Sequence, residues 1–112
     1  MNLAKRNSSR ARLAPYGKLV SASSNLHIFA GPKAWKRAQQ RKSGNAMVLP
    51  EGDEPASYRW PVRGLEVMLI WPDASRDSVL EFGEHLIRSG AKLVVAPFEG
   101  EPSGGFSFRG QL

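Results

Sequence analysis

Short apolar runs separated by turn residues dominate the hydrophobic pattern of this chain. Four runs, at residues 26–30, 46–49, 65–71 and 92–98, each predict a buried strand. The run at 65–71 (LEVMLIW) is apolar at nearly every position, which is typical of a central strand covered on both faces. A weaker run at residues 18–22 leaves open an additional N-terminal strand.

Two segments between these runs carry helical signals. Pro32 suits the first position of a helix, and we expect this helix to continue to about Lys42, before Ser43-Gly44. Ser75 is a good N-cap for a second helix over residues 76–89. The second helix has one apolar face, formed by Val79, Phe82 and Leu86 with their neighbours.

The order of these elements predicts an α/β fold. Alternating strands and helices form right-handed βαβ units, so we expect a small single-domain sandwich with a mainly parallel four-stranded sheet and two helices. A length of 112 residues suits one domain with a modest core. We interpret residues 1–15 as a flexible basic arm, residues 16–100 as the α/β domain, and residues 101–112 as a Gly-rich coil tail.

Charge is divided between the two halves of the chain. Every Asp and Glu lies at or beyond Glu51, and ten Lys and Arg precede that residue. Ten acids and six bases follow, so the formal net charge of +6 is a +10 half joined to a −4 half. Because a one-sided field attracts molecules of the opposite charge, the first half predicts a polyanionic partner.

The first predicted helix concentrates this charge. On a helical wheel, Lys33, Lys36, Arg37 and Arg41 fall with Gln40 within roughly 140° of arc. Ala34, Trp35 and Ala38 fall on the opposite side, which we expect to face the sheet. We therefore predict a site for nucleic acid, or for an acidic protein surface, formed by Lys33, Lys36, Arg37, Arg41 and Lys42 with Arg10 and Arg12 of the arm.

The loop before the third strand interleaves aromatic and basic residues. Tyr58 and Trp60 could stack on unpaired bases while Arg59 and Arg63 contact phosphates, which would make all four auxiliary contacts. The alternative is that the two rings fasten the long loop over the core, the commoner fate of such residues.

Catalytic and metal-binding signals are weak. The chain has no cysteine, and His27 and His85 stand alone without ligand spacing or a nucleophile. We therefore expect a protein without enzymatic activity, cofactor or metal. No apolar run approaches the roughly 20 residues needed to span a bilayer, and no secretory signal is visible, so we expect a cytoplasmic protein without membrane contact.

Three functions remain after these exclusions. The first is a non-catalytic protein that binds nucleic acid with low sequence specificity. The second is a small inhibitor or adaptor, of the kind found in phages and mobile elements, that docks on a host protein such as nucleic-acid machinery. The third is a homodimer or larger homo-oligomer in which the basic half of one copy meets the acidic half of another.

Overall fold

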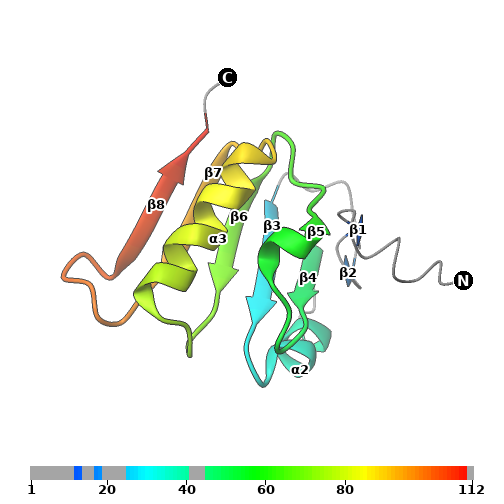
Figure 1. Ribbon diagram of the computed structural model, residues 1–112, viewed down its shortest axis with the longest axis horizontal. Coiled ribbons are helices and arrows are strands. Elements are labelled where there is room, and N and C mark those ends of the chain that lie inside the picture. The colour runs from blue at the N-terminus through cyan, green and yellow to red at the C-terminus, as the bar shows by residue number, and fades with distance from the viewer. Residues whose placement is uncertain (1–11, 14–16, 19–24, 41–44, 111–112) are drawn as a thin grey trace, which may run out of the picture.

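A six-stranded sheet forms the centre of the computed structural model, which describes residues 12–13, 17–18, 25–40 and 45–110. The strand order is β2-β4-β3-β6-β7-β8 (Figure 1). In chain order the strands are β2 (Gly17–Lys18), β3 (Asn25–Ala30), β4 (Asn45–Leu49), β6 (Glu66–Ile70), β7 (Leu93–Pro97) and β8 (Gly105–Arg109). The four central strands β4, β3, β6 and β7 are parallel, which confirms the predicted sheet.

Both edges of the sheet are antiparallel strands. The short β2 pairs with β4 and fits the N-terminal strand left open by the sequence, although residues 19–22 lie outside the described residues. At the other edge β8 pairs with β7, so the interpretation of the whole C-terminal tail as coil was wrong. Phe106 and Phe108 explain this strand, because they alternate along it and pack against the core.

A two-stranded sheet joins the N-terminal region to the long loop. β1 (Arg12–Leu13) pairs in parallel with β5 (Tyr58–Arg59), which follows a 3₁₀ turn, η1 (Pro55–Ser57). Residues 12–13 of the predicted arm therefore pair with the loop. Residues 1–11, 14 and 15 of that arm lie outside the described residues.

One face of the sheet carries the larger core. Helix α3 (Arg76–Arg88) lies over β6, β7 and β8, and the η1–β5 segment lies over β3 and β4 (Figure 1). Val79, Phe82 and Leu86 of α3 are buried, as the apolar pattern predicts. The Ser75 hydroxyl caps the helix by accepting a 3.1 Å hydrogen bond from the Ser78 N–H.

The opposite face carries a shorter helix. α2 (Ala34–Gln39) is a six-residue helix that ends before Arg41, so the prediction of a helix to about Lys42 was too long. Residues 41–44 lie outside the described residues. α2 packs over β3 and β4 and buries Phe29, Ala46 and Val48 beneath it.

Candidate functional site

Two alanines hold α2 against the sheet. Ala34 and Ala38 are buried and contact the small core formed with Phe29 and Val48. Because alanine side chains are small, the helix lies close to the strands and its other side chains extend along or away from the sheet. This close approach determines which of the predicted contact residues reach solvent.

Three cations on this helix and its first turn are exposed. We call Lys33, Lys36 and Arg37 the basic surface. Within the described residues none of the three has an ion-pair partner; the ion pair seen there joins Arg76 to Glu101 at 3.3 Å, far along the chain. Their charges are therefore not neutralised by the described part of the acidic half.

Four other cations of the basic half were predicted to contribute to this site. Arg12 belongs to the predicted arm and lies in β1, which pairs with β5. Arg10, Arg41 and Lys42 lie outside the described residues. The structure therefore brings together three of the seven predicted cations and does not test the others.

Trp35 lies beside the basic surface and not against the sheet. It is 49% exposed, the large hydrophobic side chain of the described residues that stands most open to solvent. The expectation that Trp35 faces the sheet was wrong, because it lies roughly 80° around the helix from the middle of the arc that Ala34 and Ala38 share. The two alanines alone fill the narrow contact with the strands.

The aromatic residues of the long loop are part of the core. Tyr58 is 6% exposed and Trp60 is 3% exposed. The centroid of the Trp60 ring lies 5.2 Å from the centroid of the Phe82 ring. Trp60 Nε1 donates a 3.0 Å hydrogen bond to the Pro55 carbonyl, and the Tyr58 hydroxyl donates to the Asp53 carboxylate. These rings fasten the loop over the sheet, so they present no face to a base. Of the predicted auxiliary residues, Arg59 and Arg63 are exposed, but their loop packs on the sheet face opposite α2, so the structure does not bring them together with the basic surface.

Acidic side chains gather on the face opposite α2. A cleft of about 710 Å³ lies between the long loop and α3 and is lined by Asp53, Glu54, Glu81 and Glu84, with His85 and Arg88 at its side. His85 Nε2 lies 3.4 Å from the Tyr58 carbonyl oxygen. The sequence showed an acidic half, but the convergence of loop and helix acids on one cleft depends on how the loop folds over the sheet.

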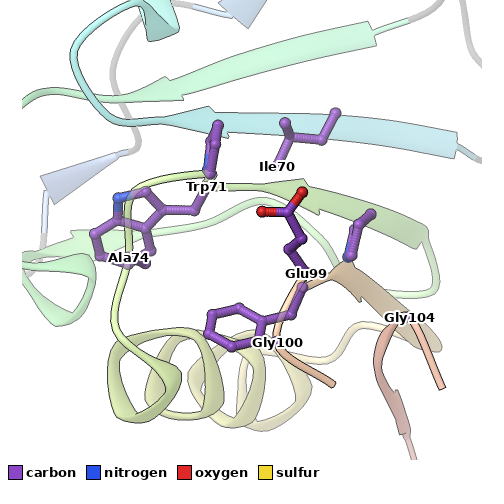
Figure 2. A pocket seen from close by; sticks show the side chains of 9 residues that line it. Ile70, Trp71, Ala74, Glu99, Gly100 and Gly104 are labelled. Atoms are coloured by element: carbon purple, nitrogen blue, oxygen red, sulfur yellow. The ribbon is translucent and has the colours of Figure 1, made fainter. Parts of the chain in front are cut away.

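A second hollow opens at the carboxyl ends of β6 and β7. It has a volume of about 590 Å³ and is lined by apolar groups of Ile70, Trp71 and Phe98 together with Glu99. Figure 2 shows the Glu99 carboxylate projecting into this space beside Ile70. Parallel α/β sheets commonly bind ligands at this end, but the hollow offers one carboxylate and no grouped catalytic side chains. The described residues also include no cluster of three or more His, Asp or Glu suited to a metal.

Comparisons with known proteins add no family to this description. Within the described part of the chain, no helix has the length and apolar character required to cross a membrane. No protein-family model, no curated protein and no solved structure matches the chain.

Proposed function

We propose that this is a non-catalytic cytoplasmic protein that binds nucleic acid with low sequence specificity through its basic N-terminal half. The observation that carries this proposal is the basic surface: Lys33, Lys36 and Arg37 are exposed together and have no ion-pair partner among the described residues. Lysine and arginine side chains neutralise phosphates and release bound counterions, and this release supplies most of non-specific affinity.

The size of α2 indicates how such binding would occur. Six residues of α-helix extend only about 9 Å, too short to place several side chains along a major groove. Contacts to the phosphate backbone therefore fit this surface better than direct reading of base edges. This is the physical reason to expect little sequence specificity.

Trp35 gives the surface a means of binding unpaired bases. Its half-exposed indole adjoins Lys36 in sequence, and base stacking on an aromatic ring contributes roughly 1–3 kcal/mol per base. Trp35 thus takes the role that the sequence had suggested for Tyr58 and Trp60. We expect single-stranded DNA or RNA to bind more tightly than a duplex of the same length.

Fluorescence anisotropy with labelled single- and double-stranded oligonucleotides, over a series of salt concentrations, tests this function. Three phosphate contacts predict a slope of log K against log salt of about −2 or steeper on a single strand. Absence of binding at low salt would refute the proposal.

A matched pair of variants separates the basic surface from net charge. Lys36→Glu should weaken binding and flatten the salt slope, whereas Arg88→Glu, which makes the same change in net charge on the acidic-cleft side of α3, should have a much smaller effect. Equal effects of both variants would show that overall charge, and not the basic surface, controls binding.

A second candidate function is docking on an acidic protein surface, as an inhibitor or adaptor. The half-exposed Trp35 favours it, because tryptophan and arginine are enriched among the residues that dominate binding energy in protein interfaces. A pull-down from nuclease-treated lysate would retain such a partner, and Trp35→Ala should release it while Lys36→Glu slows its association.

A further inference from the structure

The sheet face that carries α2 is covered over only part of its width. α2 packs on β3 and β4; on the same face of β6 and β7, Ile70 contacts the small core beneath α2, and no described segment packs on the rest. The apolar side chains there, Met68 and Ile70 of β6 with Leu93 and Val95 of β7, are half-buried. A shallow hollow of about 240 Å³ lies over Met68, Leu93 and Val95. We call this surface of β6, β7 and β8 the open strip.

An apolar face of this kind requires a covering element. Parallel strands are normally buried on both faces because crossovers place helices on each side. Outside the described residues the chain has only short apolar stretches: residues 1–11 (MNLAKRNSSRA) include three cations, and residues 19–24 (LVSASS) begin with two apolar residues. We therefore consider a second molecule in this role, because the face carries charged residues that could pair across an interface.

The open strip has side chains that match under a twofold rotation whose axis lies above β7 and runs parallel to it. In one row across the strands, Glu66 pairs with Leu93 and Leu93 pairs with Arg109. Glu66 and Arg109 thus lie on either side of β7, about 10 Å apart, and within the described residues neither has an ion-pair partner. In the next row, Met68 and Ser107 lie on either side of Val95.

Rotation about an axis parallel to β7 exchanges the members of each row. Glu66 of one copy would then face Arg109 of the other, twice in the dimer, and the long Met68 would face the short Ser107. Val95 would meet its own counterpart at the axis. Such reciprocal pairing, in which residue i of one copy contacts residue j of the other and j contacts i, is the property of a self-complementary interface.

The shape of the face favours the same arrangement. α2 stands above the sheet beside the open strip, and Arg37 and Gln40 line the hollow between this helix and β3 and β6. The rotation places β8 of one copy over β6 of the other. Because β8 is the edge strand of the sheet, it fits there beside α2, which covers the next strands, β3 and β4. A rotation about an axis across the strands would instead make the two α2 helices collide.

We propose that the open strip is a docking surface for a second copy of this chain, in a twofold dimer whose axis runs along β7. This inference is independent of nucleic-acid binding and differs from a dimer between basic and acidic halves. Three strands of five residues make a flat contact of roughly 230 Å², well below the 800 Å² per partner of a standard interface. The dimer should therefore be weak, with a dissociation constant in the micromolar to millimolar range.

Sedimentation equilibrium of the full chain, from micromolar to millimolar concentration, tests the dimer. Val95→Lys should abolish association, since it places two like charges at the axis, and circular dichroism should show an intact fold because residue 95 is only half-buried. A wild-type chain that remains monomeric at millimolar concentration would overturn the proposal.

Charge reversal identifies the orientation. Glu66→Arg or Arg109→Glu alone should weaken association by about tenfold, and the double variant should restore it. Failure of the double variant to restore association would overturn the twofold arrangement. So would association that survives Val95→Lys but is lost on Lys36→Glu, because that result would indicate contact between the basic surface and the acidic cleft.

Discussion

Gly83 of α3 lies directly against the ring of Phe108 on β8. A Cβ atom added at position 83 would approach the Phe108 ring more closely than van der Waals contact permits. The contact shows why a glycine occupies the middle of this helix, where the residue ordinarily costs about 1 kcal/mol relative to alanine. It also fixes the distance between the helix and the edge strand.

Gly83→Ala should therefore destabilise the protein, although the same change stabilises most helices. We expect a loss of roughly 1–3 kcal/mol in the free energy of unfolding, because the ring must move within a packed core. Urea denaturation measures this value. Glu84→Ala, at an exposed position of the same helix, should change stability by less than about 0.5 kcal/mol. A stabilised Gly83→Ala variant would show that the helix and β8 are packed loosely.

Ser75→Ala should remove the N-cap of α3. The Ser75 oxygen accepts the Ser78 N–H, and loss of this bond costs about 1 kcal/mol. Ser75→Asp keeps an acceptor and adds a favourable charge at the helix start, so it should retain the stability of the wild type. The same urea series would detect the difference; equal losses in both variants would contradict a capping role.

Trp60→Phe should affect folding and not nucleic-acid binding. The change removes the 3.0 Å bond to the Pro55 carbonyl and part of the contact with Phe82, so we expect a measurable loss of stability. Binding affinity at a temperature where the variant is folded should match that of the wild type. Arg59→Glu, at an exposed position of the same loop on the face opposite α2, should leave stability nearly unchanged, and its effect on binding should be smaller than that of Lys36→Glu.

Trp35 should be the tryptophan most accessible to quenchers. It is 49% exposed, whereas Trp60 is 3% exposed and Trp71 is half-buried. Because Lys36 and Arg37 adjoin Trp35, iodide should quench its fluorescence more strongly than caesium does at equal ionic strength. Trp35→Phe should remove this difference. If bound oligonucleotide protects the iodide-quenched fraction, Trp35 lies at the nucleic-acid interface.

The apolar runs predicted the central strands well. β4 and β6 lie within one residue of the ranges expected from AMVL and LEVMLIW, because buried parallel strands are continuously apolar. The missed strand, β8, shows the limit of composition: its glycines and serine suggested coil, yet Phe106 and Phe108 alternate with period two. That spacing was the signal that could have identified it.

The candidate site was harder to predict because exposure depends on packing geometry. Wheel angles placed Lys36 and Arg37 correctly in solvent, but they could not show that two alanines alone would contact the sheet and leave Trp35 outside. Nor does a loop have a period from which to infer the direction of Tyr58 or Trp60. The row that places Glu66 and Arg109 around β7 requires the strand register, which no single-chain pattern reveals.

The position of β3 has a consequence for synthesis of the chain. β3 lies between β4 and β6, and its residue Leu26 pairs with Val67, some forty residues later. During translation, β3 and α2 emerge well before β6, the second neighbour of β3 in the sheet, and they emerge within a segment that has no acidic residue. The nascent first half is thus both strongly basic and open along one strand edge. We expect its final folding to wait until residue 70 has left the ribosome.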